Sequence, residues 1–249
     1  MAFQDPFANP QAYSQTRATS FDAGLRAYML RIYNYMASAL ALTGIVSLVV
    51  ATNPALMSAF YTVQENGRAG LSGLGWLVLF APFGLVLWLS FGLQRMQTST
   101  AQAIFWAFAI LMGVSMAPVF LVYTGSSIAR TFFVTAGTFG AMSLYGYTTK
   151  RDLTGMGHFM MMGLIGIFIA SLASFIWPSP GLTFAISILG VLIFVGLTAY
   201  DTQQLKALYY QMGGSADTLT KVSIMGALKL YLDFINMFMF LLRFMGDRR

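Results

Sequence analysis

The chain has 249 residues, of which 57% are hydrophobic and only 9% are charged. Because soluble domains carry about 25% charged residues, this composition excludes a soluble globular fold and indicates a polytopic protein with one membrane domain. The absence of cysteine excludes disulfides and thiolate metal sites. The net charge of +6 does not indicate nucleic-acid binding, because the basic residues lie mostly in short loops, as membrane orientation requires.

The N-terminal segment precedes the first apolar run and is polar and poor in periodicity over residues 1–20. It contains no apolar stretch followed by a small-residue cleavage site, so the sequence predicts no signal peptide. We therefore expect residues 1–24 to form a flexible cytoplasmic tail and residues 25–249 to form the membrane domain.

Seven apolar runs near the membrane-spanning length of about 20 residues follow along the chain. They cover residues 30–52, 73–95, 101–123, 129–149, 157–177, 182–212 and 218–245. Turn compositions rich in Gly, Pro, Ser and Asp separate them. The sequence thus predicts an all-α membrane protein with seven transmembrane helices.

Lysine and arginine are distributed unequally between the two sides that seven spans create. The N-terminal side carries eight of them, namely Arg17, Arg26, Arg31, Arg95, Lys150, Arg151, Lys206 and Lys221, and the opposite side carries four, namely Arg68, Arg130, Arg248 and Arg249. This difference favours a cytoplasmic N-terminus and an external C-terminus. A re-entrant seventh span would place the C-terminus inside as well, and the sequence leaves that alternative open.

Asp201 and Asp233 are the acidic residues that lie within predicted spans. The sixth and seventh spans form a hairpin about a turn near Ser215, with Asp201 about 14 residues before it and Asp233 about 18 after, so their depths differ by only about 6 Å. An intramembrane acid is costly and usually marks a proton or ion pathway, although a structural polar cluster between helices is the alternative. Two carboxylates in one low-dielectric site cannot both ionise cheaply, so we expect this pair to titrate as a unit.

A polar stripe accompanies the second carboxylate on the seventh span. Lys229, Asp233, Asn236 and Arg243 fall within about 80° of one another on a helix. We expect this stripe to face protein or a water-filled cavity, not lipid.

Arg95 ends the second span on the same side as the turn between the last two spans. Two interpretations stay open for it. Arg95 either only anchors the orientation of the span, or its side chain bends inward and pairs with Asp201.

The segments "GLTAYDTQQLK" and "LYLDFINMFMFLLRFMG" resemble the Bax inhibitor-1 family, also called the transmembrane Bax inhibitor motif family, and its bacterial members in particular. The resemblance covers about residues 25–246. It implies a fold in which helix 7 is central and is surrounded by helices 1–3 and 4–6. It also implies a pH-sensitive calcium leak channel in which Asp201 and Asp233 form a paired proton sensor and Arg95 acts as a latch on Asp201.

The resemblance also implies a location and partners. A bacterial member would be a multi-pass protein of the inner membrane, in contact with the lipid bilayer, calcium and protons. Some bacterial members are linked to a membrane-bound protease, so a regulator that binds such a protease is the alternative function. Calcium would be the transported ion, bound only transiently, because two aspartates supply too few of the six to eight oxygens that Ca²⁺ takes.

Enzymatic readings of the same residues fit less well. The Tyr200-Asp201 pair matches half of the motif of intramembrane aspartyl proteases, but Leu-Tyr-Leu precedes Asp233 where those enzymes have Gly-x-Gly. Lys229 in the seventh span suggests a retinal protein, yet the third span has no acidic counter-ion. The single His158 has no ligand-type neighbours and no metalloprotease motif. We therefore expect no enzyme, no catalytic residue and no cofactor.

Overall fold

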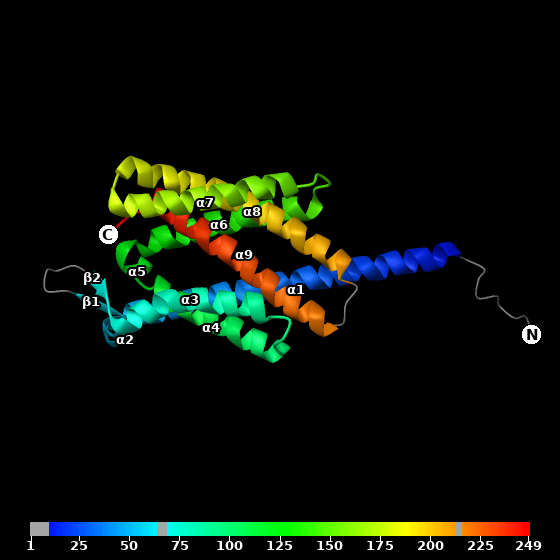
Figure 1. Ribbon diagram of the computed structural model, residues 1–249, viewed down its shortest axis with the longest axis horizontal. Coiled ribbons are helices and arrows are strands. Elements are labelled where there is room, and N and C mark those ends of the chain that lie inside the picture. Colours follow the sequence, from blue (N-terminus) through cyan, green and yellow to red (C-terminus); the bar gives the residue numbers. More distant parts are fainter. Residues whose placement is uncertain (1–9, 64–68, 213–215) are drawn as a thin grey trace, which may run out of the picture.

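A computed structural model describes the chain except for residues 1–9, 64–68 and 213–215 (Figure 1). The helices are α1 (Pro10–Thr52), α2 (Pro54–Phe60), α3 (Gly73–Gly92), α4 (Thr98–Met116), α5 (Val119–Val122), α6 (Gly125–Thr148), α7 (Thr154–Ile176), α8 (Pro180–Gln211) and α9 (Ala216–Met245). A short antiparallel pair, β1 (Tyr61–Val63) and β2 (Ala69–Leu71), interrupts this all-α architecture between α2 and α3.

The last helix occupies the centre of the bundle. α9 packs against α1 and α4 on one side and against α6 and α8 on the other (Figure 1). α3 joins the first group through α4, and α7 joins the second group through α8. The two groups correspond to the first three and the next three predicted helices, so the expected arrangement around a central last helix is confirmed.

Six of the described helices are long and apolar enough to cross a membrane. These stretches are Ala23–Thr52, Gly73–Gly92, Thr98–Val122, Thr154–Ser174, Pro180–Gln211 and Asp217–Met245. α6 corresponds to the remaining predicted span and at about 36 Å is long enough to cross the bilayer. It is more polar than the others because its inward face buries Ser127, Thr131, Thr135 and Ser143. The total of seven spans therefore stays a prediction.

The start of α1 differs from the expected tail. The structure continues this helix back to Pro10, so residues 10–24 are helical where the sequence predicted a flexible segment. Proline is tolerated in the first turn, since the N–H that it lacks would have no partner there. Another proline does not occur until Pro54, and no glycine precedes Gly24, so the sequence holds no strong helix breaker in that stretch. Residues 1–9 lie outside the described part.

The bundle has two ends, which we call the inner end and the outer end. At the inner end α3 and α8 end and α7 and α9 begin, whereas the outer end carries the β1–β2 pair and the C-terminus (Figure 1). At the outer end the Thr124 N–H donates to the Asp247 carbonyl at 3.1 Å, and the Arg249 N–H donates to the Val122 carbonyl at 2.9 Å. α9 runs without interruption from the inner to the outer end, so the described chain has no re-entrant last helix.

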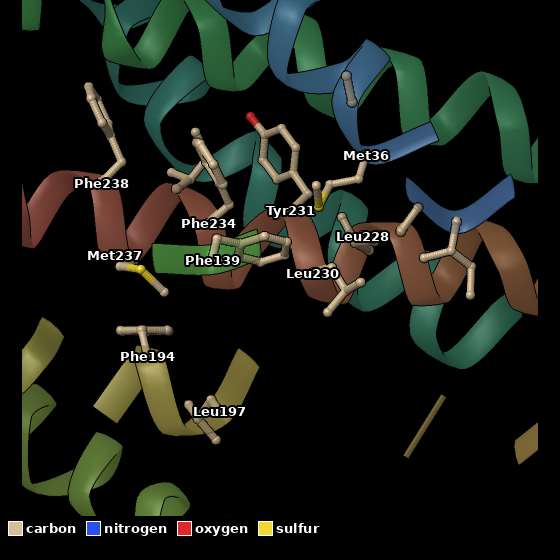
Figure 2. Close-up of a cluster of buried hydrophobic side chains, with 14 of the residues drawn as sticks. Met36, Phe139, Phe194, Leu197, Leu228, Leu230, Tyr231, Phe234, Met237 and Phe238 are labelled. Atoms are coloured by element: carbon tan, nitrogen blue, oxygen red, sulfur yellow. The ribbon is translucent and has the colours of Figure 1, made fainter. Parts of the chain in front are cut away.

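The middle of α9 is buried among side chains of its neighbours (Figure 2). Tyr231 is fully buried, and its ring lies 5.2 Å from that of Phe108, centroid to centroid. The ring of Phe234 lies 5.6 Å from that of Phe139 on α6. Such edge-to-face contacts add to the stabilisation that comes from burying the rings. This packing fixes the rotation of α9 and thereby the direction in which Asp233 points.

Candidate functional site

Asp201 of α8 and Asp233 of α9 lie together inside the bundle. Only 3% of Asp201 and 5% of Asp233 is exposed, and the two carboxyl groups are close enough to hydrogen-bond to each other. Oδ2 of Asp233 is buried and has no hydrogen-bond partner within the described residues. The structure thus brings together the two acids that the sequence placed at similar depth, in surroundings where a carboxylate needs compensation.

Two glycines allow neighbouring helices to approach the segment that carries Asp201. A Cβ at Gly146 of α6 would lie 2.1 Å from the Ala199 carbonyl oxygen, and one at Gly157 of α7 would lie 2.5 Å from the ring of Tyr200. No other residue fits at such distances. α6 and α7 therefore pack directly against the two residues that precede Asp201 and hold its backbone in place.

Lys229 supplies the positive charge at this site. Its Nζ lies 2.9 Å from Asp201 Oδ1, a contact without hydrogen-bond geometry, and donates to Gln204 Oε1 at 3.0 Å. The same ammonium lies 5.7 Å from the centre of the Tyr200 ring. Lys229 and Asp233 are one helical turn apart on α9, so both reach the Asp201 side of that helix. The charges are balanced when one proton is shared by the two aspartates.

A cavity of about 540 Å³ leads to the ammonium from the inner end. It lies between the ends of α3 and α8 and the starts of α7 and α9. Its lining residues are Leu93, Thr154, Gln204, Leu205, Ala207, Leu208, Gln211, Val222, Met225, Gly226 and Lys229. The Lys229 side chain is 44% exposed, whereas the Asp201 side chain is 4% exposed. Lys229 therefore lies between this cavity and the buried carboxylates.

Arg95 is not at Asp201 in this structure. It is exposed in the turn between α3 and α4, and within the described residues Asp201 forms its ion pair with Lys229 instead. Leu93, two residues earlier, lines the cavity that leads to Lys229. The turn that carries Arg95 is thus next to the entrance of the site, and its role as a latch stays a prediction.

The other two residues of the predicted stripe lie apart from the pair. Asn236 donates its side-chain N–H to the Leu232 carbonyl of its own helix at 2.8 Å. Arg243 is exposed near the outer end, with its guanidinium 5.9 Å from the centre of the Phe240 ring. Of the polar residues on α9, the structure therefore brings Lys229 and Asp233 to Asp201 and leaves Asn236 and Arg243 elsewhere.

The residues that follow Asp201 connect α8 to α6 and to the turn before α7 at the inner end. The sequence did not predict these contacts. Thr202 and Ser143 share a hydrogen bond of 2.9 Å between their hydroxyls. Gln203 donates to the Arg151 carbonyl at 2.7 Å and accepts from the Leu153 N–H at 2.9 Å. The signal was present as the polar run "DTQQLK" at the end of an apolar helix, since such residues need partners there.

Lys206 extends this set of contacts to the end of α6. Its ammonium donates to the Tyr147 carbonyl at 2.8 Å and lies 5.0 Å from the centre of the Tyr147 ring. A cation at the end of a helix satisfies carbonyls that have no partner within the helix.

Comparison with known proteins identifies relatives over almost the whole chain. The family described as inhibitor of apoptosis-promoting Bax1 matches residues 25–249. The inner membrane protein YbhL of Escherichia coli is 47% identical over 232 residues, which cover 91% of this chain and 94% of that protein. An uncharacterized protein of Rickettsia prowazekii is 48% identical over 95% of this chain and 98% of its own length. An uncharacterized membrane protein of Streptococcus pyogenes is 32% identical over 92% of this chain and 96% of that protein.

Proposed function

This chain belongs to the Bax inhibitor-1 family, as its two motifs indicated, and from that premise we propose that it is a pH-sensitive calcium leak channel. Asp201 and Asp233 are its paired proton sensor. The observation that carries the proposal is the interaction between these two buried carboxyl groups behind Lys229, which lines a cavity at the inner end. Carboxylate oxygens are the ligands that calcium prefers.

The shared proton gives the site its pH dependence. When the pair holds a proton, the buried charge is the single carboxylate that Lys229 balances. When pH rises and the proton leaves, a second negative charge appears in a poorly screened site and attracts any cation within reach. Arg95 is the candidate for that cation, because its turn adjoins the cavity through Leu93. Its entry would draw the end of α3 inward and close the path.

Transport fits the backbone better than peptide cleavage does. α8 and α9 pass through Asp201 and Asp233 as uninterrupted helices. A membrane protease needs an opened helix beside its aspartates to admit a peptide. In an uninterrupted helix in lipid, the backbone groups already bond within the helix and leave none free for a substrate. We therefore propose a non-enzymatic protein that needs no cofactor.

The proposal includes an orientation and a location. The inner end faces the cytoplasm, because the excess of lysine and arginine lies on that side. The relative from Escherichia coli is named an inner membrane protein, and we propose the bacterial inner membrane for this chain as well. Its partners are then the bilayer, calcium and protons.

Calcium entry into liposomes at several pH values tests the function. We expect entry through the wild-type protein to fall as pH rises. Arg95→Ala and Asp201→Asn should keep entry high at alkaline pH, since either change removes one partner of the latch. Asp233→Asn should instead move the pH midpoint and keep closure. Arg130→Ala, which removes an exposed charge at the outer end, is the control.

Two results would count against this proposal at different points. Absence of calcium entry through the wild-type protein at every pH would refute the channel. Entry through Arg95→Ala with the pH dependence of the wild type would refute the latch and leave Arg95 as an orientation anchor.

A further inference from the structure

The ammonium of Lys229 occupies the space in front of the carboxylate pair. It is 2.9 Å from Asp201 Oδ1 and 3.0 Å from Gln204 Oε1. Gln204 in turn donates to the Tyr200 hydroxyl, so its amide is oriented with the oxygen toward Lys229. An ammonium that contacts a carboxylate and a carbonyl oxygen stands where a metal cation would find the same oxygens.

The oxygens around this ammonium form a ligand set for a hard divalent cation. Asp201 provides a carboxylate oxygen and Gln204 provides an amide oxygen, and both contact the ammonium. Asp233 adds carboxylate oxygens behind Asp201, with whose carboxyl group it interacts. Oδ2 of Asp233 is buried without a hydrogen-bond partner among the described residues, so one of these oxygens has unused capacity. Calcium takes six to eight oxygens, and water from the adjoining cavity can supply the remainder.

The route to these oxygens passes Lys229. The cavity at the inner end is lined by both Gln204 and Lys229, whereas Asp201 and Asp233 lie behind them and are almost fully buried. Among the described residues, the charged group in contact with the ammonium is Asp201 of α8, and Asp233, one turn further along α9, acts on it from beyond Asp201. The end of α3 and the start of α7 contribute Leu93 and Thr154 to the same cavity, and both are uncharged.

We propose that Lys229 is a tethered cation that occupies a divalent-cation subsite formed by Asp201, Asp233 and Gln204, and that calcium must displace its ammonium to bind there. This inference rests on the proposed function, since it explains how calcium would meet the aspartates. The lysine keeps the subsite weak in two ways. It fills the position of the ion, and it repels a second positive charge at short range. A weak subsite suits an ion that must leave as well as enter.

Calcium binding to the purified protein in detergent, measured by equilibrium dialysis with radioactive calcium, tests the inference without any flux. Lys229→Gln should bind calcium about tenfold more tightly than the wild type, because the competing charge is gone. Lys229→Arg keeps the charge and should bind as weakly as the wild type. Adding Asp201→Asn to Lys229→Gln should abolish the gain.

A matched control is available on the same helix. Lys221 pairs with Asp217 at 3.0 Å, two helical turns before Lys229. Lys221→Gln removes the same charge and should leave calcium binding unchanged. Thermal unfolding establishes that each variant is folded. If Lys229→Gln is not folded, Lys229→Met, which retains the length and apolar stem of the side chain without its charge, serves the same comparison.

The outcomes separate this inference from the proposed channel. Equal calcium binding by Lys229→Gln and the wild type, or an equal gain in Lys221→Gln, overturns the tethered cation even if liposomes show calcium entry. A tenfold gain in Lys229→Gln alone supports the subsite even if the wild-type protein passes no calcium. In that case the proposed channel function is refuted and the proposed cation subsite is supported.

Discussion

The contact between α8 and α9 has an inner half and an outer half, and the side chains of the two halves differ in polarity and charge. The inner half holds Asp201, Gln204 and Lys229 and adjoins a cavity of about 540 Å³. The outer half holds aromatic side chains, among them Phe194, whose ring is stacked 6.0 Å from that of Phe240 on α9. One pair of helices thus forms a polar entrance at one end and an apolar closure at the other.

The outer closure extends to α1 and α6. The ring of Phe234 on α9 lies 5.6 Å from that of Phe139 on α6, centre to centre (Figure 2). The same ring lies 5.5 Å from that of Phe132. The cavity beside it has a volume of only about 100 Å³ and includes Phe234 and Phe238 in its lining. Such a cavity is too small for a hydrated cation, so the rings around it form a closely packed apolar region. The comparison shows that the aspartates adjoin a cavity at the inner end through Lys229, whereas aromatic rings pack toward the outer end. In the proposed channel, passage beyond the aspartates would require these rings to move.

Removing the central ring of the outer closure should have the largest effect. Phe234→Ala creates a cavity in the buried cluster and should lower the free energy of unfolding by about 3–5 kcal/mol. If the proposed channel passes this ring, Phe234→Ala should also raise calcium entry into liposomes at alkaline pH. Chemical denaturation in detergent and liposome flux measure the two effects.

Phe133 provides the matched control for that change. Its side chain is 73% exposed on α6, next in sequence to Phe132. Phe133→Ala should change the free energy of unfolding by no more than about 0.5 kcal/mol. Equal losses of unfolding free energy in Phe234→Ala and Phe133→Ala would contradict the assignment of Phe234 to the buried outer closure.

A methyl group at Gly146 should disturb the inner half instead. Gly146→Ala forces the new Cβ against the Ala199 carbonyl and should cost about 1–3 kcal/mol, since backbone must move. Gly140 lies on the same helix with open space around its Cβ position, so Gly140→Ala should not destabilise the protein. Thermal unfolding of both variants provides the measurement. A smaller loss of stability in Gly146→Ala than in Gly140→Ala would show that α6 does not pack on the Asp201 segment as described.

The contacts of Gln203 should have a smaller effect, confined to the inner end. Gln203→Ala removes two hydrogen bonds to the chain at Arg151 and Leu153 and should cost about 1–2 kcal/mol. Proteolysis at residues 149–153 should accelerate while the outer half stays protected. Gln211→Ala, at the end of the same helix, serves as the control. Unchanged cleavage in Gln203→Ala would mean that the loop is held by other contacts.

The smallest effect is expected at Asp152, which lies in the connection between α6 and α7. Its carboxylate accepts from the Thr154 N–H at 2.9 Å, and this bonding with Thr154 lowers the pKa of Asp152. A pKa that is lower in the folded than in the unfolded protein stabilises the fold. This stabilisation is fully present above the unfolded-state pKa of about 3.9 and is lost as pH falls through the folded-state pKa. Asp152→Asn should therefore lower Tm by about 2 °C or less at pH 7 and by nothing at strongly acidic pH. A difference in Tm that is equal at both pH values would remove the electrostatic explanation.

Much of the fold follows from local properties of the sequence. Long apolar runs between turn residues determine the helices of a membrane protein, because lipid requires the backbone to bond within each span. The order of these runs also predicted that α8 and α9 form a hairpin, and a constant rise per residue put Asp201 and Asp233 at similar depth. The β1–β2 pair and the early start of α1 were missed, because short polar stretches carry little periodicity.

The sequence by itself determined that this is an all-α membrane protein of the Bax inhibitor-1 family with two acids buried near each other. Only the tertiary structure decided which cation meets them. Lys229 and Arg95 both offer a positive charge in the sequence, and helix periodicity also grouped Lys229 with Arg243. The rotation of α9, the approach of α6 and α7 at Gly146 and Gly157, and the cavity beside Gln204 bring Lys229 to Asp201. These are contacts between helices distant in sequence, and no local pattern encodes them.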